Sequence, residues 1–531
     1  MSVSTVTIYD TTLRDGSQGE GVNFSLADKL KIAERLAQFG AHYIEGGWPG
    51  SNAKDLAFFR EAQKRDWGRA QIAAFGSTRK AGVTVSADPQ VRLLLDAETP
   101  VVTFFGKAWL LHVEKVLRTT PDENLRMIAD TVAFLKQRGR EVIFDAEHFF
   151  DGYQAAPDYA LKTLTVARDA GADAVVLCDT NGGMLPSAVG AITAAAGAAL
   201  GVGGRRTVSV GIHSHNDCGL GVANAVAAIE AGATQVQGTI NGFGERTGNC
   251  NLISVIPLLE LKLNRPALPA GHLRQLSEVS RFVDEIANLR HDTRAPFVGL
   301  SAFAHKGGMH VNAVNKAGVT YEHIRPELVG NRQRILVGEL SGRANVMLKA
   351  RELGIELTEQ DPRARQILDR IKTLENLGYE FESADATFEL IVRQILGNYA
   401  PFFSLDTFNI NYTRTSGTSS CAAELTVTVP NRGEPIWQSA TGDGPVNALD
   451  QALRQALTVN YPAIANITLI DYKVRILNTA HGTAARTRVL ITSSDGNNEW
   501  STVGVSDNVI EASWLALADS VEYYLLKQSA P

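Results

Sequence analysis

The chain contains few cysteines. Its 531 residues include four, Cys178, Cys218, Cys250 and Cys421, and no two of them form a C-x-x-C pair. So few thiols in so long a chain argue against a disulfide-stabilised secreted protein and favour reduced cysteines. We therefore expect a cytoplasmic protein.

Long apolar runs and a strong charge of one sign are also missing. No apolar stretch reaches the length that a bilayer requires, so we expect no membrane association. The first residues lack the basic region and apolar core of a secretory signal, and we expect none. The formal net charge of −6 gives no reason to expect nucleic acid as a partner.

Short β-branched runs recur through the first half of the chain, each followed by a stretch with helical periodicity. Leu26–Phe39 is typical of the helices, with Ser25 as N-cap and Gly40 as the stop. Eight such strands predict a TIM (β/α)8 barrel, an α/β fold. A doubly wound sheet is the alternative. The predicted strands are 6–12, 43–48, 71–75, 101–105, 141–147, 174–180, 208–215 and 235–241.

The pattern changes twice after the barrel. We expect a TIM-barrel catalytic domain over 1–290 and a mostly helical linker and lid region over 291–395. From about 396 the residues again alternate between apolar and polar, as half-buried strands do. A Gly-rich turn that enters a helix occurs near 442 and again near 504. This weak internal duplication predicts a C-terminal α+β domain over 396–531.

Polar residues gather at the carboxyl ends of the predicted strands, where barrel enzymes build their sites. His213 and His215 are two residues apart on one strand, so both imidazoles project from the same face. An H-x-H pair alone is a weak signal. Asp15 strengthens it, because the first and seventh strands are near neighbours in a closed ring, and Asn249 adds an amide oxygen. This set predicts a divalent metal site for zinc, manganese, magnesium or cobalt.

Three further residues allow a functional and a structural interpretation. Arg14 either clamps an anionic substrate or forms an ion pair with Glu45 or Asp10. Glu147, at the end of the fifth predicted strand, is either a proton-transfer group or a partner of Arg14 or Arg79. Thr180 either binds a substrate carboxylate or is a helix N-cap.

Three motifs together resemble the acetyl-CoA-condensing TIM-barrel metalloenzymes, which include 2-isopropylmalate, homocitrate and citramalate synthases. Their order and spacing match the family, and the C-terminal region resembles the regulatory domain of leucine- and isoleucine-pathway members, so the resemblance covers nearly the whole chain. The motifs are Asp10-Thr-Thr-Leu-Arg14-Asp15-Gly, His213-Ser-His215-Asn-Asp217 and Asn241-Gly-Phe-Gly-Glu245-Arg-Thr-Gly-Asn249.

The resemblance implies roles for single residues. Asp15, His213 and His215 would bind the metal with Asn249 nearby. Arg14 and Thr180 would hold a 2-keto acid, with Arg79 as a further substrate-binding candidate. Glu147 would assist proton transfer, and the lid would contribute His310 and Tyr321. The residues do not rank Glu147 against His310 as the base.

Several segments depart from the leucine-pathway members. The second predicted strand reads Glu45-Gly-Gly-Trp48-Pro, where those relatives carry Phe-Pro, and the lid reads His310-Val-Asn-Ala. These departures resemble the citramalate synthase branch. The expected activity is the condensation of pyruvate with acetyl-CoA and water to give citramalate and CoA, in isoleucine biosynthesis. The alternatives are a 2-isopropylmalate synthase, an acyl-CoA lyase and a non-catalytic sensor.

The C-terminal domain is expected to sense an end product. The two helix starts at Gly442–Gly444 and Gly504–Asp507 offer backbone amides that suit an amino acid carboxylate. Isoleucine is the expected effector, and the structural alternative is that these glycines only make tight turns. By resemblance, the lid reaches into a partner barrel, which implies a homodimer.

Overall fold

The computed structural model describes residues 5–201, 208–307, 313, 320–336, 343–355, 357, 361–430, 432–477 and 485–529. Contacts divide the chain into two compact units. The first comprises Met1–Phe303 and Ile324–Arg332, and the second comprises Ala304–His323 and Gln333–Pro531. Each unit has a buried apolar core of its own.

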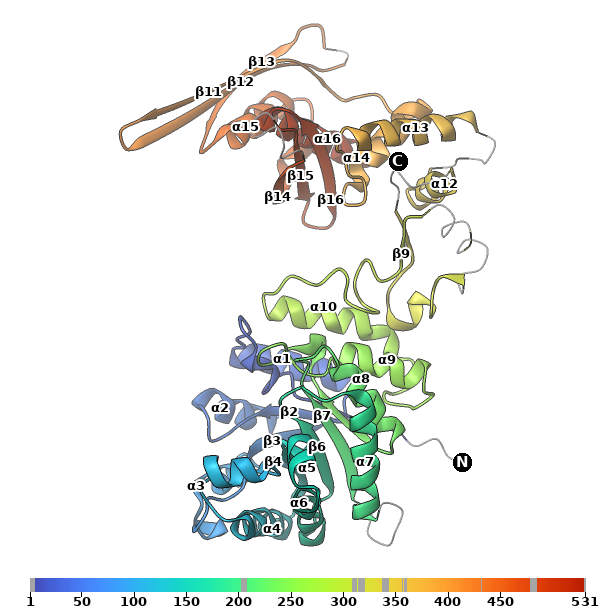
Figure 1. Ribbon diagram of the computed structural model, residues 1–531. Helices are drawn as coiled ribbons and strands as arrows, with labels where there is room; N and C mark the ends of the chain where they lie inside the picture. The colour runs from blue at the N-terminus through green and yellow to red at the C-terminus, as the bar shows by residue number, and fades with distance from the viewer. Residues whose placement is uncertain are drawn as a thin grey trace. The chain divides into compact units, whose positions relative to one another are not determined.

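The first unit is a closed barrel of eight parallel strands in chain order, which confirms the predicted fold (Figure 1). Strand β8 pairs with β1 from Thr7 opposite Gln235 to Asp10 opposite Gly238, and this pairing closes the ring. The last strand ends three residues before its predicted end, because Ile240–Gly242 forms a 3-10 turn. The strands are β1 Thr7–Asp10, β2 Tyr43–Gly47, β3 Gln71–Ser77, β4 Val101–Lys107, β5 Glu141–Glu147, β6 Ala174–Asp179, β7 Ser209–Ser214 and β8 Gln235–Gly238.

Helices surround the barrel. Helix α1 begins and ends as predicted: Ser25 and Asp28 form a capping box, and Gly40 ends the helix with a left-handed φ of 107°. None of the described helices is both long and apolar enough for a bilayer crossing. The helices of this unit are α1 Leu26–Phe39, α2 Ala53–Ala62, α3 Pro89–Asp96, α4 Pro121–Gln137, α5 Phe149–Ala155, α6 Pro157–Ala170, α7 Pro186–Leu200, α8 Gly221–Glu230, α9 Leu252–Leu261 and α10 Leu276–Ile286.

The second unit begins with the segment that we expected to be mostly helical. Its described part has three helices, α12 Arg343–Glu352, α13 Pro362–Asn376 and α14 Asp385–Leu396. It also has a feature that the sequence did not predict, a short parallel pair of strands, β9 Ala304–His305 and β10 Arg334–Ile335. Two residues a strand are too few for a periodic pattern.

The C-terminal part repeats one motif, three antiparallel strands followed by a helix. The helix packs against its own sheet in each copy, and the expected duplication is therefore present. Figure 1 shows β11 and β12 as a long hairpin. The first copy is β11 Ser404–Thr415, β12 Thr418–Thr428, β13 Ile436–Gly442 and α15 Pro445–Thr458; the second is β14 Thr468–Ile476, β15 Thr487–Ser494, β16 Glu499–Ser506 and α16 Val509–Gln528.

The prediction of two glycine-rich helix starts is wrong for Gly504, which lies within β16, five residues before α16 begins, whereas Gly442 ends β13 just before α15. A Cβ atom on Gly504 would lie 2.0 Å from the Ala512 carbonyl oxygen, and one on Gly442 would lie 2.5 Å from the Ala448 amide nitrogen. Both glycines therefore allow a strand to approach its helix closely. Gly444 is the N-cap of α15 with open space around it. Asp507 forms an ion pair with Arg486. These contacts give Gly442 and Gly504 a packing role.

Replacing Gly504 by valine should destabilise the C-terminal part, since its side chain would overlap the α16 backbone. We expect a loss of about 1–3 kcal/mol in the free energy of unfolding, typical of overpacking. Gly444→Ala, at a position with an extended backbone and no close neighbour, is the matched control. Thermal unfolding followed by circular dichroism measures both, and equal transitions in the two variants would contradict the packing role.

Candidate active site and metal centre

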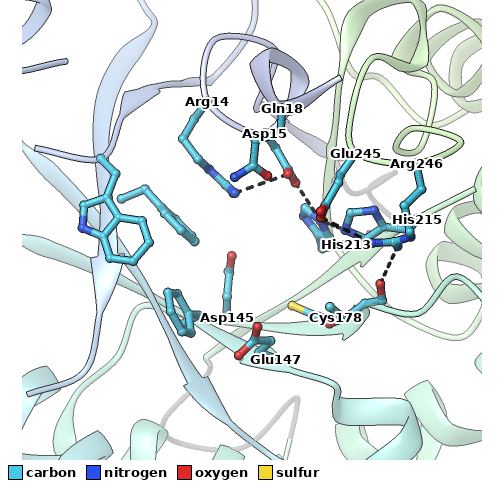
Figure 2. Close-up of a pocket in the computed structure, with 14 residues that line it drawn as sticks. Arg14, Asp15, Gln18, Asp145, Glu147, Cys178, His213, His215, Glu245 and Arg246 are labelled. Carbon is cyan, nitrogen blue, oxygen red and sulfur yellow. Dashed lines mark hydrogen bonds and ion pairs between the residues drawn. The ribbon is translucent and has the colours of Figure 1, made fainter. Parts of the chain in front are cut away.

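A cavity of about 260 Å³ opens at the carboxyl ends of the barrel strands. Figure 2 shows Arg14 and Asp15 across this cavity from Asp145 and Glu147, with the two histidines at one end. The cavity therefore combines cationic, anionic and imidazole groups. It is lined by Arg14, Asp15, Gln18, Trp48, Phe75, Phe105, Asp145, Glu147, Cys178, Thr180, His213, His215, Glu245 and Arg246.

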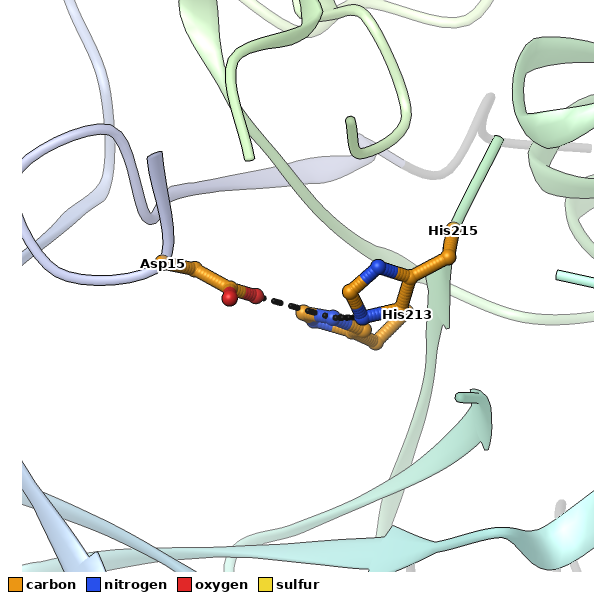
Figure 3. A group of neighbouring side chains, drawn as sticks. All are labelled: Asp15, His213 and His215. Atoms are coloured by element: carbon orange, nitrogen blue, oxygen red, sulfur yellow. Dashed lines mark hydrogen bonds and ion pairs between the residues drawn. The ribbon is translucent and has the colours of Figure 1, made fainter. Parts of the chain in front are cut away.

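Asp15, His213 and His215 converge at that end of the cavity (Figure 3). Their potential ligand atoms all lie within 4.8 Å of one another, and all three residues are buried. His213 Nε2 lies 3.2 Å from an Asp15 carboxylate oxygen and 3.3 Å from His215 Nε2. Two imidazole nitrogens and a carboxylate at this spacing form a donor set that suits a divalent transition metal.

Electrostatics distinguish the three groups: burial lowers the pKa of His213, but Asp15 outweighs burial and raises it. Burial raises the pKa of Asp15, but Arg14 and His213 outweigh burial and hold it well below its usual range. Burial and the neighbouring His213 lower the pKa of His215 to about 4. Asp15 is therefore an anion, and His215 is neutral at physiological pH with a lone pair to donate.

A further polar atom also fits a cation. Among the described residues, Asn249 Oδ1 is a buried atom without a hydrogen-bond partner. Asn249 forms a backbone bridge with His215, and its side-chain amide donates to the Phe243 carbonyl at 3.1 Å. Asn249 does not line the cavity, however. Only the backbone bridge to His215 places Asn249 beside the site. Its role as a metal ligand stays a prediction.

Arg14 lies between the acidic group and the aromatic wall of the cavity. Its Nε donates to Glu45 at 2.5 Å, and its Nη1 lies 3.4 Å from Asp15. Its guanidinium carbon is 3.7 Å from the centre of the Phe75 ring. Glu45 is fully buried and also accepts from the Tyr9 hydroxyl at 2.7 Å. The predicted ion pair between Arg14 and Glu45 is therefore present. Arg14 also lines the cavity.

Glu147 and Thr180 lie on neighbouring strand ends at the cavity. Glu147 forms an ion pair with Lys107 at the end of β4, and neither Arg14 nor Arg79 is its partner among the described contacts. The Thr180 hydroxyl accepts from the His148 backbone N–H at 2.9 Å, and Thr180 does not cap a helix. Both side chains line the cavity.

Arg79 requires a correction, because the structure does not bring it to the cavity. Its guanidinium donates to Glu123 and Asp130 on α4, at 2.8 Å each, and to the Lys80 carbonyl. Through these two ion pairs Arg79 connects the loop after β3 to α4. His310 lies outside the described residues. Tyr321 belongs to the second unit, where about half of its side chain is exposed.

Sequence reasoning missed two groups that line or support the cavity. The first is an aromatic wall in which Trp48, Phe75 and Phe105 have ring centres 5.7–5.9 Å apart. The second is Asp145 with Gln237, buried in the barrel interior. Alternation along the strands could have indicated the second group, because Asp145 shares a face with Glu147, and Gln237 shares one with Gln235.

Known proteins match this chain along nearly all of its length. The HMGL-like family model matches residues 5–283. The (R)-citramalate synthase of Aquifex aeolicus is 52% identical over 522 residues, which is 98% of each chain. The chain belongs to the (R)-citramalate synthase family. The citramalate synthase of Synechocystis sp. is also 52% identical, over 98% of this chain and 96% of that one. The resemblance stated from the motifs is confirmed.

The comparisons also separate the citramalate synthases from the 2-isopropylmalate synthases. A probable 2-isopropylmalate synthase of Methanopyrus kandleri is 31% identical over 97% of each chain, well below the citramalate synthases. The C-terminal residues 382–525 match the LeuA allosteric (dimerisation) domain, and residues 297–378 match the homocitrate synthase post-HMGL domain-like family. The chain thus combines an HMGL-like barrel with a C-terminal domain that matches the LeuA allosteric (dimerisation) family.

A divalent cation should raise the unfolding temperature of this protein, since a ligand bound only to the folded state stabilises it. At one hundred times the Kd the gain is about 2.7 kcal/mol. Differential scanning calorimetry with zinc, manganese, cobalt or magnesium measures it. His215→Ala should abolish the shift, and His272→Ala, a histidine that bonds the Phe39 carbonyl instead, should keep it. A shift of equal size in both variants would argue against the site.

Proposed function

We propose that this chain condenses pyruvate with acetyl-CoA and water to give (R)-citramalate and CoA. The observation on which the proposal rests is the Asp15, His213 and His215 group beside Arg14 in one cavity. Identity of about 50% to citramalate synthases over nearly the full length supports the choice of reaction.

The residues of the cavity suit a 2-keto acid. Asp15, His213 and His215 would hold the divalent metal, with Asn249 nearby, and a bound metal would polarise the keto carbonyl as a Lewis acid. Arg14 would pair with the pyruvate carboxylate, because its guanidinium is fixed by Glu45 and presents further N–H groups to the cavity. The Thr180 hydroxyl would donate a second hydrogen bond to that carboxylate.

Acid–base chemistry then falls to the chain's own groups. A methyl proton of acetyl-CoA is removed as the new carbon–carbon bond forms to the keto carbon, and the keto oxygen becomes a hydroxyl. Glu147 is the candidate base in the cavity, where it forms an ion pair with Lys107. His310 and Tyr321 of the lid are the other candidates for proton transfer. Water finally hydrolyses the thioester and releases CoA, which makes the overall reaction favourable.

A thiol-release assay tests the reaction. Acetyl-CoA with pyruvate should release CoA, and 2-ketoisovalerate should release it far more slowly. His213→Ala should abolish release, because it removes one of the three converging ligands. Glu147→Gln should lower kcat by about 10²–10⁴-fold if Glu147 is the base. Absence of release with every keto acid of a panel would reject the proposal.

The aromatic wall should limit the size of the keto acid. Pyruvate carries a methyl group where 2-ketoisovalerate carries an isopropyl group, and each methylene is worth roughly 1–3 kcal/mol in a pocket. Trp48→Ala should therefore lower the preference for pyruvate over 2-ketoisovalerate, in kcat/KM, by about tenfold or more. Trp67→Ala, outside the cavity, is the control. An unchanged ratio in Trp48→Ala would mean that another element limits the substrate.

Regulation and assembly belong to the same proposal. We infer a barrel catalytic domain over 1–290, a linker and lid over 291–395 and a regulatory domain over 396–531, with isoleucine as effector and a homodimer as the assembly. The allosteric class of the C-terminal match supports the regulatory role. The four unpaired cysteines among the described residues support a cytoplasmic location. Isoleucine should inhibit CoA release, and inhibition by leucine alone would identify a different effector.

A further inference from the structure

The two candidate histidine ligands differ in what holds their imidazole rings. His213 has a buried hydrogen-bond partner on the side away from the cation site, whereas His215 Nδ1 has none among the described residues. The partner of His213 is the side-chain amide of Gln237, directly opposite it in the β7–β8 register. The distance from His213 Nδ1 to Gln237 Oε1 is 2.9 Å.

Gln237 is itself oriented from the other end. Its side-chain Nε2 donates to Asp145 Oδ1 on β5 at 3.0 Å, across the interior of the barrel. Asp145, Gln237 and His213 are 3%, 1% and 6% exposed, so water does not compete for these bonds. Above its pKa the Asp145 carboxylate can only accept, so the Gln237 NH₂ group then faces Asp145.

This orientation determines where the proton of His213 sits. Because the amide NH₂ faces Asp145, the amide oxygen faces His213, and an oxygen can only accept. His213 Nδ1 must therefore carry the hydrogen, and in the neutral ring the lone pair is on Nε2. That nitrogen lies 3.2 Å from Asp15 and 3.3 Å from His215 Nε2. The lone pair thus points to the place where the ligand atoms converge.

We propose that Asp145 and Gln237 form a positioning relay that fixes the tautomer of His213 so that Nε2 is free to bind the metal. The inference rests on the metal site of the proposed function and adds two residues that act through His213. Hydrogen bonds of this kind orient histidine ligands and raise their basicity, and their loss typically weakens metal binding by 10- to 100-fold.

The first test measures metal affinity directly. Zinc or cobalt is titrated into the full-length protein in competition with a chromophoric chelator at pH 8. This pH lies above the pKa of Asp145, which burial raises to about 7. Gln237→Leu keeps a side chain of similar size but removes the hydrogen bonds to His213 and Asp145. It should weaken metal binding by 10- to 100-fold. Gln235→Leu is the matched control, because Gln235 is buried on the same face of β8 and lies opposite Gly211, not His213, in the β7–β8 register.

A second pair of variants separates the relay from simple charge. Asp145→Asn and Asp145→Leu both remove the negative charge, but only asparagine keeps an acceptor for Gln237. The relay predicts that Asp145→Leu binds metal several-fold more weakly than Asp145→Asn. It also predicts that the Asp145→Leu and Gln237→Leu double variant is no weaker than Gln237→Leu alone. Equal affinity of the two Asp145 variants would show that charge alone acts.

The third readout is the tautomer itself. Long-range ¹H–¹⁵N correlation of histidine side chains in the metal-free protein should show His213 protonated on Nδ1. Gln237→Leu should shift His213 toward protonation on Nε2, and the His213→Gln variant assigns its signals. Retention of the Nδ1 proton, with a Kd within twofold of the unsubstituted protein, would overturn the inference alone. Absence of metal binding by the unsubstituted protein would overturn the metal site and the relay together. If Gln237→Leu does not fold, the Asp145 pair decides the question.

Discussion

Closure of the barrel between β1 and β8 is the constraint on which the site depends. Asp15 and His213 are about two hundred residues apart in the chain, and only the ring of eight parallel strands brings them within 3.2 Å. The β1–β8 and β7–β8 registers set which residues share a level of the barrel. A shift of one residue in either register would turn inward side chains outward, and Asp15 and the histidines would no longer converge.

The sequence predicted the barrel because its signals are local and repeated. β-Branched runs and helix caps such as Ser25 and Gly40 depend on neighbours in the chain, and the structure has them within a few residues of the predicted bounds. The same holds for Asp15, His213 and His215, since strand ends of a parallel barrel meet at one rim. What could not be predicted is which long side chain reaches which partner. Arg79 forms ion pairs with Glu123 and Asp130 on α4, and Lys107 forms one with Glu147. Side-chain reach and helix position, which determine these pairs, are set only in the folded chain.

The glycines of the C-terminal repeats illustrate the same limit. A Gly-rich turn before a helix predicts free backbone amides, but glycine is also needed where a helix lies against its strand. At Gly442 and Gly504 the nearest helix atoms leave no room for a Cβ atom, whereas Gly444 has open space. A sequence pattern identifies such positions without distinguishing close packing from ligand binding, because both use the missing side chain.

The cavity has two chemically different walls, and this difference has consequences for selectivity. The polar wall consists of Asp15, His213 and His215, where burial and mutual charge shift all three pKa values. The apolar wall is formed by Trp48, Phe75 and Phe105, and Arg14 connects the two through its contacts with Asp15 and with the Phe75 ring. A small molecule with a carboxylate and carbonyl at one end and a short alkyl group at the other matches both walls. The buried Glu45 holds the Arg14 guanidinium in place between the two walls.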